Sequence, residues 1–227
     1  SVARTLYVDA SSTAGSGSIT APFNSISHAA KSARPGDTVL VRRGVYSEKV
    51  KINTSGRLGA PIVIKGERGA VIDGSRTKVD TLVDIGGDHI IFEGFEVRNA
   101  SRTGIGLWGT FHTVVRKNVV VGSQGAGIWV GHDRRGGSGK NVVEYNIVRD
   151  NCRMNRARNR DSGWPIGIAI AVSDQSIVRA NRVYENHGEG IGVLSSSNVK
   201  VHGNVVYDNF SVNIYLDNAP KSYVQAN

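Results

Sequence analysis

Two columns of residues recur along this chain at the same interval. The first is an apolar residue three positions before a Gly or Asn, with members Ile91, Val115, Val143, Val178, Val201 and Val224. The second is the isoleucine of a Gly-Ile or Asn-Ile step, with members Ile105, Ile128, Ile168, Ile191 and Ile214. Relative to an interval of 23 residues, the first column contains excesses of 5 and 12 residues, and the second contains 17. Both columns therefore place the same two insertions in the chain.

A fixed repeat of this length is typical of a solenoid, in which each repeat packs on its neighbours. Each interval contains short stretches of alternating apolar and polar residues between turns, which is the pattern of β-strands. Val39, Ile62 and Ile85 continue the interval toward the N-terminus. We therefore predict an all-β fold, a right-handed parallel β-helix of coils of about 23 residues, forming one domain over residues 1–227.

Asparagines recur near the turns, at Asn99, Asn151, Asn186 and Asn209. In coils stacked about 4.8 Å apart, amide side chains at equivalent positions can hydrogen-bond to one another along the axis. We therefore predict an asparagine ladder at this corner of the coil.

The two ends of the predicted solenoid differ. An apolar face at helical spacing precedes a Pro-Gly-Asp stop, and its members are Phe23, Ile26, Ala29, Ala30 and Ala33. Because an open solenoid end exposes unpaired strand edges, we predict a capping helix over residues 22–33. No equivalent segment follows the last coil. We expect an uncapped C-terminal end, either because the chain is a fragment or because another chain covers it.

The net charge of +9 favours acidic partners such as uronate polysaccharides, nucleic acid or anionic surfaces. No nucleic-acid-binding module accompanies this charge, so nucleic acid is the least favoured partner. No apolar run approaches the roughly 18 residues of a membrane span. No charged and apolar leader precedes Ser1, so we expect the mature form of a secreted or cell-surface protein.

The segment from YVDASS through VRRGVYSEKVKI to GAPIVIKGERGAVIDGS resembles the opening of secreted pectate lyases of polysaccharide lyase family nine. The resemblance covers essentially the whole chain and is strongest over about the first 75 residues. It implies a parallel β-helix, acidic calcium ligands at the turn into the Gly-Ile strand, and a lysine base on a later coil. These motifs specify an architecture that proteins of several functions share.

Most of the catalytic set that the resemblance implies has no counterpart in this sequence. The calcium-binding turn falls at residues 188–192, where Glu189 is the only acid. The same turn of the preceding coil falls at residues 163–166, with only Asp161 nearby, and the lysine position falls near Tyr215. These departures count against ordinary pectate lyase activity.

Strand residues alternate between the two faces of a sheet, so the neighbours of the inward isoleucines face solvent. On that outer face we expect an aromatic strip suited to stacking on sugar rings. Two basic insertions, at residues 132–140 and 151–165, flank it on opposite edges like the walls of a groove, and arginine forks suit carboxylate recognition. The predicted substrate-binding residues are Trp108, Trp129, Trp164, Asp217, Arg134, Arg153 and Arg160. The alternative is a set of ordinary surface aromatics and solvated charges.

Cleavage of a uronate chain by β-elimination needs a base for the C5 proton and positive charge to stabilise the enolate-like intermediate. The candidate bases are His132, His187 and Tyr215, and the candidate arginines are Arg135, Arg156 and Arg158. A structural or solvent-exposed role is the alternative for both histidines.

Asp150, Glu185 and Asp208 are expected to stack along one edge of adjacent coils, because each follows a turn asparagine by four residues. Neighbouring carboxylates repel one another unless a cation or an arginine intervenes, and oxygen ligands suit calcium. Calcium is therefore a candidate cofactor, with Glu189 as a further ligand. The alternative is a solvated acidic edge neutralised by Arg149 or Arg182.

Two functions remain open on the sequence. The first is an extracellular protein that binds an acidic polysaccharide and cleaves it as a lyase by β-elimination. The second is a non-catalytic structural or surface subunit that stacks end to end on copies of itself, through the open C-terminal end, into a filament.

Overall fold

The computed structural model describes residues 2–227, and they form a solenoid of three parallel sheets. Sheet A consists of β1 (Thr5–Val8), β2 (Thr38–Val41), β5 (Ile62–Gly66), β8 (Ile90–Glu93), β11 (Val114–Arg116), β14 (Val142–Glu144), β17 (Ile177–Arg179), β20 (Lys200–His202) and β23 (Tyr223–Gln225). Sheet B consists of β3 (Gly44–Tyr46), β6 (Ala70–Asp73), β9 (Glu96–Arg98), β12 (Val119–Val121), β15 (Ile147–Arg149), β18 (Arg182–Tyr184) and β21 (Val205–Tyr207). Sheet C consists of β4 (Val50–Ile52), β7 (Thr81–Ile85), β10 (Thr103–Trp108), β13 (Ile128–Gly131), β16 (Ile166–Ala171), β19 (Glu189–Leu194) and β22 (Ile214–Asp217).

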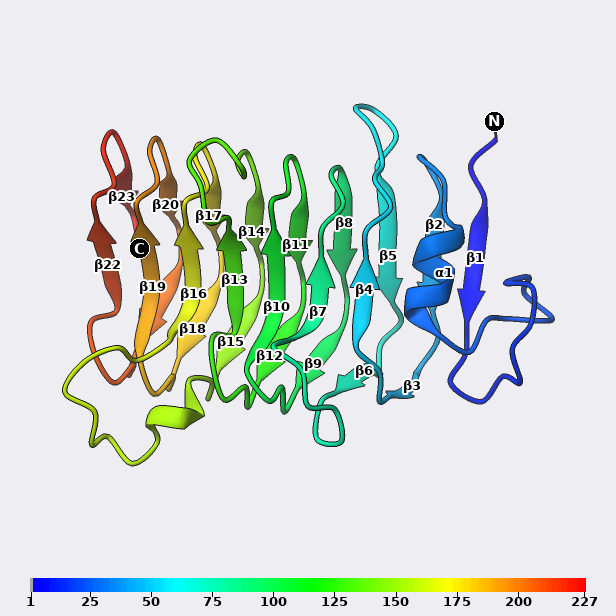
Figure 1. Cartoon of the computed structure of the whole chain (residues 1–227), viewed down its shortest axis with the longest axis horizontal. Coiled ribbons are helices and arrows are strands. Elements are labelled where there is room, and N and C mark those ends of the chain that lie inside the picture. Colours follow the sequence, from blue (N-terminus) through cyan, green and yellow to red (C-terminus); the bar gives the residue numbers. More distant parts are fainter. Residues whose placement is uncertain (1) are drawn as a thin grey trace.

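Each coil passes through one strand of sheet A, one of sheet B and one of sheet C before the next coil begins. In Figure 1 the strands of sheet C run upward in front, those of sheet A run downward behind, and the chain advances from right to left. This combination makes the solenoid right-handed. The predicted all-β parallel β-helix is confirmed.

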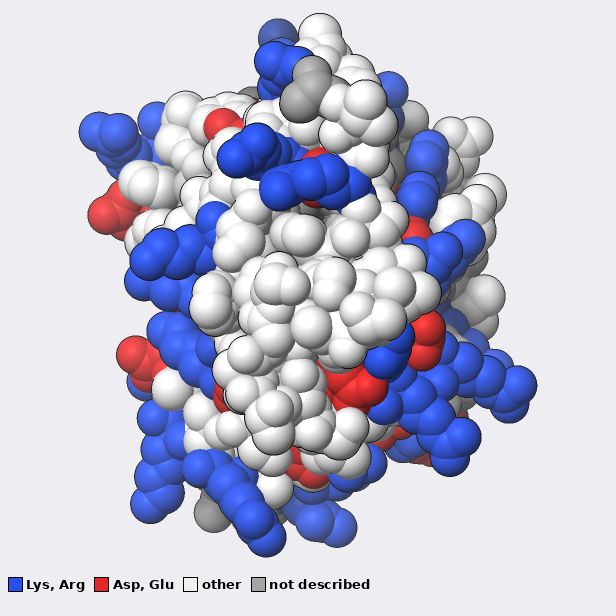
Figure 2. Space-filling model, turned by 90° about the vertical axis from the view of Figure 1, so that its right-hand side faces the viewer, with Lys and Arg blue, Asp and Glu red and all other residues white. Residues whose placement is uncertain are grey.

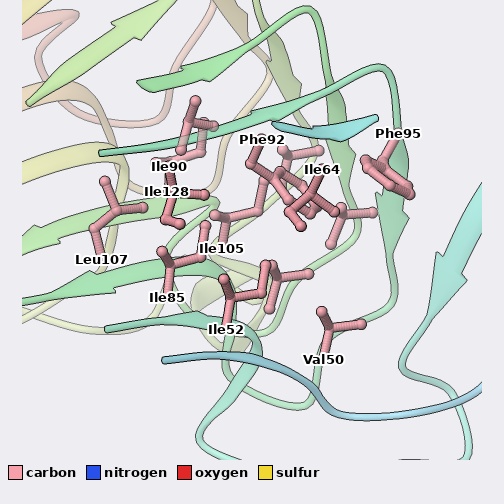
Figure 3. Packing of buried hydrophobic residues seen from close by; sticks show 14 of the residues in the cluster. Val50, Ile52, Ile64, Ile85, Ile90, Phe92, Phe95, Ile105, Leu107 and Ile128 are labelled. Atoms are coloured by element: carbon pink, nitrogen blue, oxygen red, sulfur yellow. The ribbon is translucent and has the colours of Figure 1, made fainter. Parts of the chain in front are cut away.

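The core lies inside the coils and is continuous from one coil to the next. It forms because strand residues alternate in direction, so that one apolar side chain of each pair points inward. Phe92 and Phe95 stack within it, with ring centroids 4.6 Å apart. Figure 3 shows Phe92 beside Ile64, and both side chains are fully buried.

The second sequence column stacks as predicted, because Ile105, Ile128, Ile168, Ile191 and Ile214 are partners in adjacent strands of sheet C. The first column needs a correction at its start. Val115 pairs with Phe92, while Ile91 lies beside Val114.

The N-terminal extension of the repeat is also wrong. Val39 pairs with Ile64, Ile62 pairs with Ile90, and Ile85 lies in sheet C. The coil from Val39 to Ile64 spans 25 residues, so the 23-residue spacing joins positions that are not equivalent.

Asparagine amides connect successive coils at two corners. At the corner between sheets A and B, the amide nitrogens of Asn118, Asn146, Asn181 and Asn204 each donate to the amide oxygen of the next asparagine, over 2.8–3.2 Å. At the next corner, Asn151 donates to Asn186 over 3.1 Å, and Asn186 donates to Asn209 over 2.9 Å. These bonds satisfy polar groups that the turns would otherwise leave buried without partners.

Asn99 does not belong to this series. Ala100 occupies the equivalent position in its coil. In the next coil Ser123 occupies it and donates its backbone N–H to the Asn151 amide oxygen over 3.0 Å. Asn99 instead has a φ of 58° and lies one residue earlier, beside Gly122. Sequence spacing alone did not separate these two adjacent positions.

Charged side chains alternate in sign across the outer face of sheet A. The Arg116 Nε lies 2.6 Å from the Glu93 carboxylate, and Arg179 lies 2.7 Å from that of Glu144. Both carboxylates are largely buried beneath the arginines. Opposite charges facing one another across strands add a modest stabilisation of about 0.2–1 kcal/mol per pair.

Helix α1 (Ile26–Ser32) takes the place of a sheet C strand in the first coil and packs against β4. It is shorter than the predicted 22–33, because Ser25 caps its first turn by accepting from His28 N–H and Ala33 already has an extended conformation. Phe23 pairs with Val8 and covers the edge of β1 instead of joining the helix.

The surface around the N-terminal end is basic at its sides. Figure 2 shows lysines and arginines along both flanks of this end, around a mainly uncharged centre. No helix in the described residues is both long and apolar enough to cross a membrane.

We predict that Asn146→Ala destabilises the protein by about 3 kcal/mol, because the change leaves the Val115 carbonyl and the neighbouring amides without buried partners. Urea unfolding followed by circular dichroism measures this. The matched control is Asn227→Ala in the exposed last coil, where water can replace the lost bonds and we expect a loss below about 1 kcal/mol. Equal losses of unfolding free energy in the two variants would show that burial of the asparagine amide does not determine its contribution to stability.

Candidate functional site

The outer face of sheet C is one part of the surface where side chains and loops form hollows. Its central column contains the paired residues Gly106, Trp129, Ala169, Gly192 and Tyr215. The adjacent column contains Trp108, Gly131, Ala171, Leu194 and Asp217. The strand alternation expected from the sequence therefore describes this face correctly.

Trp108 and Trp129 form a stacked pair on this face. Their ring centroids lie 5.1 Å apart at an interplanar angle of 19°, and about half of Trp108 is exposed. The backbone of Gly131 makes room for this arrangement, since a Cβ there would lie 3.1 Å from the Trp129 ring and would also meet the carbonyl oxygen of Ala171. Packing thus requires glycine at position 131.

Two hollows lie on either side of Trp129. The first, of about 330 Å³, is lined by Arg102, Thr103, Gly125, Ala126, Trp129, Met154, Gly163, Trp164, Pro165, Ile166, Ala169 and Leu194. The second, of about 310 Å³, is lined by Asp80, Thr81, Arg102, Thr103, Trp108 and Trp129. They share Arg102, Thr103 and Trp129, so together they form one groove along sheet C.

The 151–165 insertion forms a wall of this groove through apolar residues. Its base is fixed by backbone hydrogen bonds to the preceding coil and by the short 3-10 helix η1 (Arg153–Asn155). Trp164 stands over the groove and meets Phe210 edge to face, with centroids 5.5 Å apart. In Figure 1 this insertion is the long yellow-green loop below sheet C, and the 132–140 insertion lies at the opposite edge of the sheet.

The arginines of the two insertions do not line the hollows. Arg153 pairs with Asp150, and the Arg158 guanidinium lies 5.5 Å from the centre of the Phe210 ring. Arg134, Arg135, Arg156 and Arg160 are exposed on their loops. Arg102, by contrast, belongs to both hollows, although sequence reasoning missed it. Its only signal was its place two residues before the Gly-Ile strand, which no repeat column marked.

A hydrogen-bonded cluster connects the 151–165 insertion to the next coil, and it consists of Asp150, Arg153 and His187. Asp150 accepts from Arg153, and its Oδ1 lies 3.0 Å from His187 Nε2. The Asn155 amide adds a 2.7 Å hydrogen bond to the His187 carbonyl oxygen. Burial alone would raise the pKa of Asp150, but the hydrogen bonds from Arg153 and His187 outweigh it and hold the pKa below its usual value.

At the opposite edge, His132 makes its polar contacts within its own loop. Its Nδ1 accepts from the Arg134 N–H over 3.1 Å and lies 2.6 Å from the Asp133 carboxylate, and its ring packs between Gly109 and Gly137 beside Trp108. Tyr215 is the candidate base that stays open to the outer face, with 41% of its surface exposed.

The proposed calcium ligands are not gathered into a site. Asp150 is engaged by Arg153 and His187, while Glu185 and Asp208 occupy exposed turn positions with positive φ. Across residues 2–227, no group of three or more acidic, histidine or cysteine side chains is placed to hold a metal ion. The donor set therefore does not fit the calcium that the fold family implies, and calcium binding stays a prediction from the sequence.

Two further ionisable groups lie near the groove wall. Burial raises the pKa of the Cys152 thiol, which therefore stays protonated and is a poor nucleophile. Burial also raises the pKa of Glu189, although hydrogen bonding from the Trp164 side chain acts in the opposite direction.

Comparison with known proteins identifies the class and then the family. The fold is a right-handed parallel β-helix. The family model of the Pel9A-like right-handed β-helix region matches residues 6–211. The chain belongs to this family. A search of curated proteins finds no match.

Three solved structures illustrate the likeness. The pectate lyase Pel9A has a TM-score of 0.76 at 21% identity, over 93% of this chain and 55% of the lyase. XylC in complex with xylose has a TM-score of 0.70 at 12% identity, over 97% of this chain and 65% of XylC. The periplasmic alginate epimerase AlgG, as a T265N mutant, has a TM-score of 0.57 at 16% identity, over 84% of this chain and 50% of the epimerase. At these identities the likeness shows the fold, and the chain spans about half to two thirds of each matched protein.

We predict that Asp150→Asn destabilises the protein by about 1–2 kcal/mol near neutral pH, because the variant keeps the shape but loses the charge that holds Arg153 and His187. Asp150 has a lower pKa in the folded protein than in the unfolded chain, so its ionised form stabilises the fold. This contribution to the free energy of unfolding is fully present above the unfolded-state pKa and is lost as the pH falls through the folded-state pKa. The difference between wild type and variant should therefore vanish in acid. Thermal melts across the pH range measure it, with Asp161→Asn on the exposed part of the same loop as control.

Proposed function

We propose that this protein is an extracellular β-helix that binds an acidic polysaccharide along the outer face of sheet C. The observation that carries the proposal is the stacked Trp108–Trp129 pair, flanked by two hollows that share Arg102. Aromatic faces provide broad apolar area for sugar rings, and an arginine fork supplies paired donors for a carboxylate.

The shape of the site fits a chain better than a small molecule. The hollows lie in line across successive strands of sheet C, and both are open to solvent at the surface. A polymer can occupy both at once, so that each additional sugar contributes without its own loss of translational freedom. The matched pectate lyase and alginate epimerase are named for acidic polysaccharides, which supports this class of ligand.

Cleavage by β-elimination is the second part of the proposal. A base removes the C5 proton, the C4–O bond breaks, and a double bond forms between C4 and C5, while the leaving oxygen takes up a proton. Tyr215 is the candidate base because it alone of the three candidates is free of an ion pair on the outer face. Arg102 joins the candidate arginines Arg135, Arg156 and Arg158 as a source of charge for the enolate-like intermediate.

We expect Trp129→Ala and Arg102→Ala each to weaken binding of polygalacturonate about tenfold, which corresponds to about 1.4 kcal/mol. Isothermal titration calorimetry measures the affinities, and urea midpoints recorded in parallel show whether each variant is folded. Arg68→Ala, an exposed arginine outside both hollows, should bind as wild type does.

The same assay tests the arginines of the long insertion. An Arg156→Ala, Arg158→Ala double variant with wild-type affinity would limit recognition to the groove itself and remove the predicted arginine wall. Loss of affinity in Arg68→Ala as well would reduce the interaction to non-specific attraction by the net positive charge.

For catalysis, we expect absorbance of an unsaturated uronate product to appear with at least one of pectate, alginate or a glycosaminoglycan. Tyr215→Phe should abolish the rate and leave affinity nearly unchanged, because only the phenolic oxygen is removed. Absence of product across all three polymers, with intact binding, would leave a binding protein without lyase activity.

A non-catalytic structural subunit that stacks end to end into a filament stays the alternative prediction from the sequence. Size-exclusion chromatography and negative-stain imaging distinguish a monomer from a filament.

A further inference from the structure

A third hollow lies on the outer face of sheet C, at its N-terminal end. It has a volume of about 360 Å³ and is lined by Ser27, Lys31, Lys51, Asn53 and Thr54. Helix α1 contributes the first two of these residues, and β4 with the loop after it contributes the other three. These five residues form the lysine hollow.

The two lysines lie close together because Ser27 connects α1 to β4. The Ser27 Oγ accepts a 3.0 Å hydrogen bond from the backbone N–H of Lys51. Lys31 follows Ser27 by four residues in α1, and residues four apart lie on the same face of a helix. Lys51 points outward from β4, because Val50 and Ile52 on either side of it are buried. Both lysine side chains therefore border the same hollow, and both are exposed.

The acidic side chains nearest to the lysine hollow already have partners. The Glu48 carboxylate accepts from backbone N–H groups in the first turn of α1, the shorter bond measuring 2.7 Å. The Asp84 carboxylate lies 3.5 Å from Lys49 Nζ. In the part of the chain that the structure describes, neither Lys31 nor Lys51 forms a salt bridge. The hollow therefore carries two positive charges that no acidic side chain neutralises, which favours an anionic ligand.

The lysine hollow lies in line with the tryptophan pair of the groove. The outward column of sheet C that contains Lys51 continues through its partners Asp84, Gly106 and Trp129. Neighbouring strands lie about 4.8 Å apart, so Lys51 is three strand spacings, or roughly 14 Å, from Trp129. The lysines and the tryptophans thus belong to one face and one line.

A second column makes the same connection. A Cβ built on Gly86 would lie 3.0 Å from Asn53 Oδ1, so the Asn53 side chain reaches over the backbone of the next coil. In the coil after that, Leu107 pairs with Ile85. Gly86 and Trp108 are the residues that follow this pair, so Asn53 lies in the column of Trp108. An extended ligand on the tryptophan pair can therefore continue along sheet C into the lysine hollow.

We propose that the lysine hollow is a further subsite for the acidic polysaccharide, in which Lys31 and Lys51 bind a uronate carboxylate of a chain whose other sugars stack on Trp108 and Trp129. This inference rests on the proposed function. A lysine ammonium group is a compact charge with three donors, and it forms charge-assisted hydrogen bonds with carboxylates. Asn53 adds an amide that can bond to sugar hydroxyls.

The position of the lysine hollow makes recognition depend on the length of the sugar chain. One sugar lengthens an extended polysaccharide by about one strand spacing, so contact with both Trp129 and the lysines needs about four sugars. A trimer is too short to occupy both ends. In a longer chain the second contact is intramolecular and raises the affinity of the whole chain.

The first experiment compares galacturonate oligomers of about three and about twelve sugars on wild type and on a Lys31→Gln, Lys51→Gln double variant by calorimetry. Glutamine removes each charge and keeps most of the side-chain stem. We expect the double variant to bind the longer oligomer about tenfold more weakly than wild type does, and the trimer with unchanged affinity. Urea midpoints recorded in parallel show whether the variant is folded.

The matched control is a Lys65→Gln, Lys200→Gln double variant, which removes two charges from exposed residues of sheet A. Its affinity for the longer oligomer should equal that of wild type. An equal loss in this control overturns the subsite, because attraction by the net positive charge then explains the effect.

The second experiment locates the contact directly. Acetylation of wild type followed by mass spectrometry measures the rate at which each lysine amine reacts. The longer oligomer should slow acetylation of Lys31 and Lys51 several-fold and leave the rates at Lys65 and Lys200 unchanged. Equal rates at Lys31 and Lys51 with and without the bound oligomer overturn the subsite.

The remaining outcomes separate this inference from the groove on which it rests. If the Lys31→Gln, Lys51→Gln variant binds the longer oligomer as wild type does, while Trp129→Ala binds it more weakly, the lysine subsite is overturned and the groove stands. Equal losses for the trimer and the longer oligomer also overturn a separate subsite. No binding of the longer oligomer to wild type overturns the groove and this inference together.

Discussion

The structure depends on satisfying backbone polar groups where each coil turns a corner. Strands solve this problem by pairing with the coils above and below, but the turns between sheets have no ladder of their own. Buried asparagines supply the missing partners, since each amide donates to the next asparagine and to a carbonyl of the preceding coil. This requirement holds the coils in register. Insertions are therefore tolerated only where the added residues project from the solenoid as loops.

The candidate site follows from that constraint. The outer face of a flat parallel sheet has no hollows of its own. On sheet C, two features raise walls above the strands and so create the groove. Large aromatic side chains stand beside glycines, as Trp129 does beside Gly131, and an insertion brings Trp164 over the strands. The insertion can hold this position because Asp150 binds it to His187 of the next coil. The scaffold is shared with the Pel9A-like family. The groove combines residues of the sheet C coils with residues of the 151–165 insertion.

Much of the fold could be predicted because the apolar periodicity reports directly on strand alternation. The isoleucine column of sheet C and both insertions were located from spacing alone. Errors of one residue arose within the columns: Ile91 was placed where Phe92 lies, and Asn99 was placed where Ala100 lies. A repeat fixes the position of a column only to within one residue unless a turn or a glycine identifies it.

The sequence by itself determined the architecture, the outward position of Trp108 and Trp129, and the two places where loops emerge. Only the tertiary structure decided what those loops do, because their side chains follow no repeat. It showed that Arg153 and His187 share Asp150, and that apolar residues and Arg102 line the hollows. The physical reason is that ionic and aromatic contacts depend on side chains brought together from different coils, which no local pattern encodes.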